Sequence, residues 1–217
     1  MNEWYWWSCY KNRKRKIIGI GGAVIKTGAG EELKKRIDDI EMIIFNGGAM
    51  FHDFQLALEK DKIRPLTSIP IKELNNSLER IEYTSKYFWE YLRGRDPPKN
   101  SLTEICQRNN IPTLLFTALG CDYWQMFDDE WELIGKRCRK DFEILRNRMH
   151  KPFHYINMGS AVIHPEVFTK AIQGIKHEFR ADVVDFLDMY RPRTRVSIYG
   201  NYYKMDFKEY LEKEWSK

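Results

Sequence analysis

Short apolar runs alternate with amphipathic segments over most of the chain, and this alternation limits the fold more than any other feature. The runs have the continuous apolar character of strands that are buried on both faces of a sheet. The predicted strands are "KIIGIGGAV" (16–24), "EMIIFNGGA" (41–49), "IPTLLFTALG" (111–120), "PFHYINMGSAV" (152–162), "ADVVDFLDMY" (181–190) and "TRVSIYG" (194–200). Helical patterns separate them, so we expect an α/β fold: a Rossmann-like, doubly wound, largely parallel sheet with helices on both faces.

The amphipathic segments predict the covering helices. The longest spans 69–94, and the helix over 101–110 begins with a capping box in which Ser101 precedes Glu104 by three residues. The other predicted helices cover 28–40, 51–60, 128–149, 164–175 and 206–215. The only candidate linker, "RDPPKN", is too short to separate two cores. We therefore expect an N-terminal aromatic and basic arm (1–16), followed by a single domain (17–217).

Composition narrows the class of protein. The 36 basic and 31 acidic residues are interleaved, which indicates a mixed surface and no nucleic-acid partner. No run reaches the ~20 apolar residues of a membrane span. Four cysteines form no CxxC pair, which favours a reduced, cytoplasmic protein.

Pro152 between His150 and His154 opposes a shared helical face, so no metal site is expected. The aromatic arm is expected to pack on the domain or on a neighbouring subunit, with membrane-surface anchoring as the alternative.

Small residues lie at the ends of four of the predicted strands. Because the carboxyl ends of parallel strands share one edge of a sheet, these turns are expected to lie together where ligands bind in such folds. They are Gly21-Gly22, Asn46-Gly47-Gly48, Ala118-Leu119-Gly120 and Gly159-Ser160-Ala161. "GAGEEL" and "GIGGAV" are partial dinucleotide fingerprints. Any one turn is an ordinary tight connection, but four at one edge favour a nucleotide-type ligand.

A second group of candidates, "GCDYWQMFDDEWE", follows the run at 111–120. Carboxylates beside aromatic faces suit an organic cation, so Asp122 and Trp124 are candidate substrate-binding residues. Asp128 is assigned the capping of the next helix. His52 is either a base, a nucleotide contact or a hydrogen-bonded structural residue, and His164 has the better claim because it follows a ligand-edge turn.

The ordered series of motifs resembles a known family. "VIKTGAGEELKKRI", "MIIFNGGAMFHDFQLAL", "SLTEICQRNNIPTLLFTALGCD" and "YINMGSAVIHPEVFTKAI" are similar to the core of deoxyhypusine synthase and its bacterial deoxyhypusine synthase-like relatives. The resemblance runs in order from about residue 17 to the C-terminus. It implies NAD as the cofactor, spermidine as the substrate, transfer of an aminobutyl group to an acceptor amine, and a homo-oligomer, a tetramer in the family, with active sites between subunits.

The resemblance also implies roles for individual residues. Its cofactor contacts fall on Lys26, Thr27, Gly28, Asn46, Gly47, Gly48, Asp53, Gly159, Ser160, Gly200 and Asn201. His164 falls at or beside a substrate-binding histidine, and Asp122 stands near the acid-bearing loop of the family. Phe51 and His52 replace a pair of family acids at the second turn, with Asp53 kept, which puts ribose recognition in doubt.

The main departure from the family lies late in the chain. The family's long loop carries the lysine that forms a covalent imine, whereas here "DFLDMYRPRTRVSIYGN" joins the last strands directly. Lys204 is the nearby lysine and the candidate for that catalytic place. Arg191, Arg193 and Arg195 replace the acidic loop and suit a carboxylate or phosphate. The expected function is an NAD-dependent aminobutyl transferase acting on a small amine. The alternatives are a non-catalytic nucleotide-binding subunit and an NAD enzyme with an anionic substrate.

Overall fold

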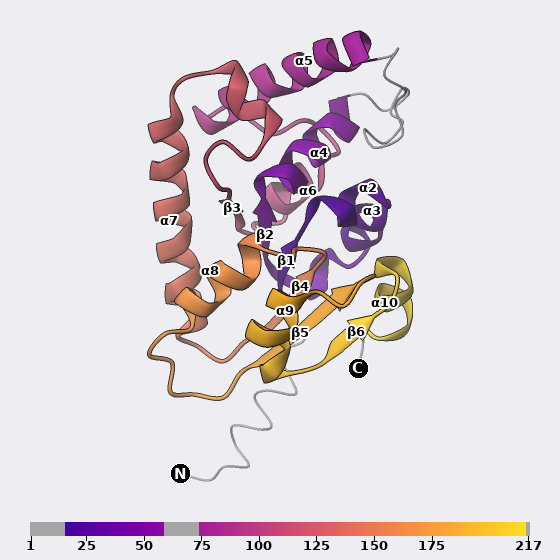
Figure 1. The fold of residues 1–217 in the computed structure, drawn as a ribbon, viewed down its shortest axis with the longest axis vertical. Helices are drawn as coiled ribbons and strands as arrows, with labels where there is room; N and C mark the ends of the chain where they lie inside the picture. Colours follow the sequence, from indigo (N-terminus) through magenta and orange to yellow (C-terminus); the bar gives the residue numbers. More distant parts are fainter. Residues whose placement is uncertain (1–15, 59–73, 216–217) are drawn as a thin grey trace.

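A computed structural model describes residues 16–58 and 74–215, and it contains a six-stranded sheet in which every pair of neighbouring strands is parallel (Figure 1). The order across the sheet is β3-β2-β1-β4-β5-β6. The strands are β1 (Lys16–Ile20), β2 (Ile40–Asn46), β3 (Thr113–Phe116), β4 (His154–Met158), β5 (Arg180–Asp185) and β6 (Tyr202–Lys204). The sheet is thus Rossmann-like and confirms the predicted fold class.

Helices cover both faces of the sheet, as the alternating pattern predicts. The α-helices are α2 (Gly22–Lys26), α3 (Ala29–Lys34), α4 (Gly47–Leu58), α5 (Leu74–Leu92), α6 (Leu102–Arg108), α7 (Trp131–Met149), α8 (Ile163–Ala171), α9 (Tyr190–Arg195) and α10 (Phe207–Lys213). Short 3-10 turns are η1 (Ile37–Asp39), η4 (Tyr123–Phe127) and η5 (Ser197–Tyr199). Ile18 and Ile20 of β1 join a core formed with α2–α6 and α10, while Ile17 joins a second core with α7 and α8. This two-residue alternation of buried side chains is what a strand produces.

Helix α7 closes the edge of the sheet at β3. The Asp141 carboxylate accepts a hydrogen bond from Leu115 N at 2.8 Å, and Arg137 donates to the carbonyl of Thr113 at 3.0 Å. Asp141 and Arg137 also pair with each other at 2.7 Å, one helical turn apart. These side chains satisfy backbone groups that a seventh strand would otherwise bind.

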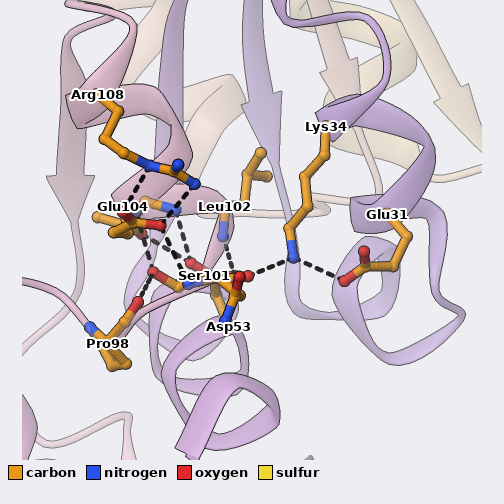
Figure 2. Close-up of polar contacts among 10 residues, drawn as sticks. Glu31, Lys34, Asp53, Pro98, Ser101, Leu102, Glu104 and Arg108 are labelled. Atoms are coloured by element: carbon orange, nitrogen blue, oxygen red, sulfur yellow. Dashed lines mark hydrogen bonds and ion pairs between the residues drawn. The ribbon is translucent and has the colours of Figure 1, made fainter.

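The predicted capping box at the start of α6 is confirmed (Figure 2). Ser101 Oγ accepts a hydrogen bond from Glu104 N at 3.0 Å and donates to the carbonyl of Pro98 at 2.7 Å. The Glu104 carboxylate returns to Asn100 N at 3.0 Å, one residue before Ser101. This cap fixes where the chain leaves the 93–100 loop and enters α6.

Several predicted strands end earlier in the structure than the sequence pattern indicates, and two departures bear on the site. Residues 22–24, predicted as the end of a strand, belong to α2 (Gly22–Lys26). The predicted strand 194–200 is instead the end of α9 followed by η5, and the last strand comes later, at β6. Pro192 explains the second difference, because proline is favoured in the first turn of a helix and here lies in the first turn of α9.

The predicted arm lies outside the described residues except for Lys16, which begins β1. Among the described residues, no helix is both long and apolar enough to cross a bilayer.

Candidate functional site

The strand order reverses direction between β1 and β4. The chain runs outward from β1 to β2 and β3, then returns to the other side of β1 and runs outward again through β5 and β6. In open parallel sheets, ligands bind outside the carboxyl ends of the two strands at such a reversal. Gly21 follows β1 there, and its N–H donates to the carbonyl of Met158 at 2.8 Å. A Cβ at Gly21 would overlap the carbonyl of Gly159, so the structure brings the first and fourth predicted turns into direct contact.

The turn after β2 lies against the loop that follows β3. A Cβ at Gly47 would overlap Oδ2 of Asp122 and lie 2.7 Å from Thr117 Oγ1, so glycine is required here by the chain's own carboxylate. Thr117 Oγ1 donates to Asp122 Oδ2 at 2.6 Å. Burial raises the pKa of Asp122, and the hydrogen bond from Thr117 opposes that rise. The Asp122 carboxylate therefore sits at the start of α4 with one oxygen held by Thr117.

The turn after β4 packs against α10. Gly159 has a φ of 62°, and a Cβ there would lie 2.8 Å from the ring of Phe207 in α10. Positive φ favours glycine, so two independent constraints require it at this position. Ser160 is buried, and its Oγ accepts a hydrogen bond from His164 N at 3.2 Å. The Ser160 hydroxyl is therefore occupied in anchoring α8.

A partly exposed strip runs from the starts of α2 and α4 to the far end of α2. Gly22, Asn46, Gly48 and His52 lie at and near those two starts, and Lys26 is the last residue of α2. A Cβ at Gly22 would meet nothing closer than His52 Cδ2 at 3.4 Å, and one at Gly48 nothing closer than Asp122 Oδ1 at 3.5 Å. A side chain at Gly21 or Gly47 would clash with another part of the chain, whereas one at Gly22 or Gly48 would not. The strip therefore offers bare backbone to a ligand at the carboxyl ends of β1 and β2.

His52 is the residue of this strip that the sequence left undecided. Its Nδ1 lies 3.3 Å from Gln55 Oε1, an arrangement in which Nδ1 carries the proton and Nε2 is left as an acceptor. Burial, followed by the charge of Lys26, lowers the pKa of His52 to about 4. The ring is therefore neutral at neutral pH. Its position beside Gly22 follows from the packing of α2 on α4, which local sequence patterns do not show.

The residues around Gly28 form the outer end of α2. Lys26 and Thr27 are exposed, and partial burial lowers the pKa of Lys26. Thr27 Oγ1 donates to the carbonyl of Ala23 at 2.9 Å. Gly28 has a φ of 78°, and a Cβ there would lie 3.3 Å from Lys208 Nζ. Lys26 thus lies in the open strip, whereas Thr27 and Gly28 form the link to α3.

Asp53 serves the fold and not the strip (Figure 2). It is 4% exposed, and its carboxylate accepts hydrogen bonds from Leu102 N at 2.7 Å, Thr103 N at 2.9 Å and Thr103 Oγ1 at 2.8 Å. All of these donors belong to the first turn of α6. The predicted cofactor role of Asp53 is therefore corrected, because its carboxylate is buried and fully used at another helix.

The two predicted catalytic residues lie apart. His164 is 1% exposed, and a Cβ at Gly19 would lie 2.9 Å from its Nδ1. Neither ring nitrogen has a hydrogen-bond partner among the described residues. Burial lowers the pKa of His164 to about 4. Lys204 is exposed at the end of β6, beside Asp185 of β5. It lies two strands beyond β4, or about 10 Å at the usual strand spacing.

The loop after β3 holds Trp124 and Asp128 in structural roles. Trp124 is fully buried against Phe88 and Trp89 of α5, so it forms no part of an open substrate site. Asp128 does not cap α7: the N-cap residue is Glu130, and the Asp128 carboxylate pairs with Arg93 and accepts from Glu130 N at 3.1 Å. These contacts fasten the loop to α5, whereas Asp122 of the same loop lies beside Gly47 and Gly48.

The late basic segment is already paired within the chain. Arg191 and Arg195 contact the Glu166 carboxylate at 3.4 and 3.0 Å, and Arg193 contacts Asp188 at 3.3 Å. Gly200 and Asn201 precede β6, and Asn201 N donates to Asp182 Oδ1 at 2.8 Å. They therefore lie at the amino edge of the sheet, away from Gly21, Gly48 and Gly159, because the last strand begins later than the sequence predicted.

The comparisons with known proteins show the fold. No family model and no curated protein matches the sequence. Among solved structures, AgrE in a ternary complex with ornithine and NAD+ is 19% identical over 97% of this chain and 31% of that one, with a TM-score of 0.60. A putative LOR/SDH protein from Methanococcus maripaludis S2 is 18% identical over 94% and 62%, with a TM-score of 0.57. A putative deoxyhypusine synthase from Entamoeba histolytica is 12% identical over 91% and 73%, with a TM-score of 0.52.

This chain thus spans less than a third of the length of AgrE and about three fifths of the Methanococcus protein. The similarities show the fold, an α/β, Rossmann-like one that is shared with AgrE, whose solved complex contains NAD+.

Proposed function

We propose that the protein binds a nicotinamide dinucleotide of the NAD type at the carboxyl edge of its sheet and uses it on an organic amine, as a deoxyhypusine synthase-like transferase. The observation that carries the proposal is the reversal of strand order between β1 and β4, beside which the strip of Gly22, Asn46, Gly48, His52 and Lys26 lies open. The structural likeness to AgrE with bound NAD+ and to a deoxyhypusine synthase supports the choice of cofactor.

The residues of the strip fit such a ligand. Gly22 and Gly48 have no side chain, and no neighbour within the chain would be displaced by one, so their backbone is accessible to a ligand. Lys26 supplies a positive charge for phosphate. Gly21, Gly47 and Gly159 lie next to the strip, and their lack of a side chain lets neighbouring groups of the protein approach the backbone closely. When bound, the dinucleotide supplies a hydride acceptor for oxidation of a carbon next to nitrogen.

Asp122 is the proposed contact for the amine. One carboxylate oxygen is held by Thr117, and the other, Oδ1, faces the start of α4 near Gly48. Burial raises the pKa of this carboxylate, which an ammonium group would offset by charge pairing. The spermidine-like substrate and the aminobutyl transfer rest on the sequence resemblance, and so does the proposed homo-oligomer.

The alternative function is a dinucleotide-binding subunit without catalysis. Two observations favour it: the ring of His164 is buried in the core, and Lys204 lies two strands from the reversal of strand order. Neither residue reaches the strip in this conformation. The two functions differ in turnover and not in cofactor binding, so one pair of measurements separates them.

The test combines calorimetric titration of NAD with spermidine-dependent formation of the reduced cofactor, followed by absorbance. Binding with turnover supports the transferase, binding without turnover of any amine supports the alternative, and absence of binding contradicts both. Native mass spectrometry of the purified protein reports the oligomer and any co-purified nucleotide.

An Asp122→Asn substitution tests the amine contact. We expect the KM for the amine to rise about tenfold with the affinity for NAD unchanged, because a charge-assisted contact is lost. Asp129→Asn in the same loop is the matched control, since Asp129 is exposed and lies seven residues further along the chain. Equal KM values in the two variants would contradict the role of Asp122.

A further inference from the structure

Gln125 is a buried polar residue in the loop that follows β3. It belongs to η4 and is 1% exposed. Its amide makes three hydrogen bonds within the loop. Oε1 accepts from Gly120 N at 2.6 Å, and Nε2 donates to Thr117 Oγ1 and to the carbonyl of Ala118, both at 3.1 Å. The Gln125 side chain therefore holds together the part of the loop that carries Asp122.

The partners of Gln125 fix which way its amide points. Because the backbone N–H of Gly120 can only donate, the atom that faces it is the amide oxygen. The amide nitrogen must then face Thr117 and Ala118, and the carbonyl of Ala118, which can only accept, agrees with a nitrogen at this position. Thr117 Oγ1 therefore receives a hydrogen from Gln125.

The hydroxyl of Thr117 passes this direction on to Asp122. A hydroxyl has one hydrogen, which remains available to an acceptor when its oxygen accepts from Gln125. Asp122 Oδ2 lies 2.6 Å from Thr117 Oγ1, whereas the carbonyl of Ala118 lies 3.3 Å away, so the hydrogen is donated to the carboxylate. The other carboxylate oxygen, Oδ1, lies toward Gly48.

This hydrogen bond matters because no cation of the protein has been found to balance Asp122. In the described ranges 16–58 and 74–215, no lysine or arginine forms an ion pair with its carboxylate. Burial raises the pKa of Asp122, and the hydrogen bond from Thr117 opposes the rise by stabilising the ionised form. We call the series Gln125, Thr117 and Asp122 the relay.

We propose that Gln125 is a positioning residue for the amine: through Thr117 it keeps Asp122 ionised, with Oδ1 directed to the ligand at the start of α4. This inference rests on the proposed function, in which Asp122 contacts the amine. A carboxylate held as an acceptor binds an ammonium group through a charge-assisted hydrogen bond, so the relay selects the protonated form of the group that binds there.

The first test measures the KM for spermidine in variants of the relay. Thr117→Val keeps the size of the side chain and removes the hydroxyl, and Gln125→Glu replaces the Nε2 donor with an acceptor. We expect the KM to rise about tenfold in Thr117→Val and about threefold in Gln125→Glu, with the affinity for NAD unchanged. Thr117→Ser keeps the hydroxyl and should have a KM close to that of the wild type. Thr194→Val, at an exposed threonine of α9, is the control.

A double-mutant cycle separates positioning from a purely structural role. If Thr117 and Gln125 act through Asp122, neither Thr117→Val nor Gln125→Glu should raise the KM further when Asp122→Asn is already present. Effects that add to the effect of Asp122→Asn overturn the proposal. So do KM values for the relay variants that equal the KM of Thr194→Val.

A second measurement tests the relay without turnover. The carboxyl-carbon NMR signal of Asp122, assigned by its absence in Asp122→Asn, reports the protonation of this side chain as the pH is changed. The pKa of Asp122 should be higher in Thr117→Val and Gln125→Glu than in the wild type, and close to the wild-type value in Thr117→Ser. An unchanged pKa in Thr117→Val and Gln125→Glu overturns the proposal even if spermidine is turned over. If no amine is turned over, the proposed transferase fails, while the shift in pKa still supports the relay.

Discussion

Asp53 is a buried carboxylate that joins α4 to α6. Its three hydrogen-bond donors lie 49 and 50 residues further along the chain. An acid just after a glycine turn has the sequence pattern of a cofactor contact, and the partners that decide otherwise are distant in sequence. Ser101, by contrast, caps α6 through Glu104, three residues away, and was predictable. At the scale of single residues, the sequence shows which polar groups are near a turn but not which of them are already bonded.

Asp53→Ala should destabilise the fold by about 3 kcal/mol, because it leaves buried N–H groups of Leu102 and Thr103 without an acceptor. Urea unfolding followed by circular dichroism measures the change. Asp38→Ala, at an exposed acid of η1, is the control and should change the free energy of unfolding by less than about 0.5 kcal/mol. If Asp53→Ala costs no more than the control, the carboxylate is not anchoring α6.

His164 predicts a dependence of stability on pH. Burial lowers its folded pKa to about 4 from the ordinary 6.5. Between these values the unfolded chain binds a proton that the folded chain does not, so stability falls as the pH drops below 6.5. From about pH 7 to about pH 5, the wild type should lose on the order of 2 kcal/mol more than His164→Gln. If the two proteins lose the same free energy of unfolding between these pH values, the ring is not buried as a neutral group.

Helix α7 both covers a face of the sheet and closes the edge of the sheet at β3. It covers one face of the sheet with Leu145 and Met149 and also bonds the edge of β3 through Asp141 and Arg137. The amphipathic pattern predicted the helix and its buried face, because side chains three and four residues apart share a face. The contact between Asp141 and β3 was not predictable from a helix pattern, because it joins residues 26 apart in sequence.

Asp141→Ala is expected to lower the free energy of unfolding by about 3 kcal/mol, since it removes the acceptor for Leu115 N and the partner of Arg137 in a buried position. Chemical denaturation gives the value. Glu143→Ala removes the exposed pair with Arg139 on the same helix, and surface pairs contribute little, so its effect should stay below about 1 kcal/mol. A smaller loss in Asp141→Ala than in Glu143→Ala would refute the account of the edge.

At the scale of the whole molecule, the doubly wound order was foreseen from the alternation of apolar runs and helices, and the sheet is parallel throughout. The place of the strand reversal was not foreseen, because pairing of β1 with β4 joins segments separated by more than a hundred residues. The same reversal brings Gly21 to Gly159 and opens the strip beside α4. Gly200 and Asn201 fall at the other edge because the end of α9 and η5 occupy sequence that has the pattern of a strand.

Hydrogen–deuterium exchange of the full chain, with and without saturating NAD, tests the location of the proposed ligand most directly. Binding across the β1–β4 reversal should slow exchange in the segments 20–28, 46–52 and 158–162 and leave the exposed face of α7 unchanged. Protection confined to the amino edge around 198–202, or no protection in any segment at saturating dinucleotide, would contradict the account.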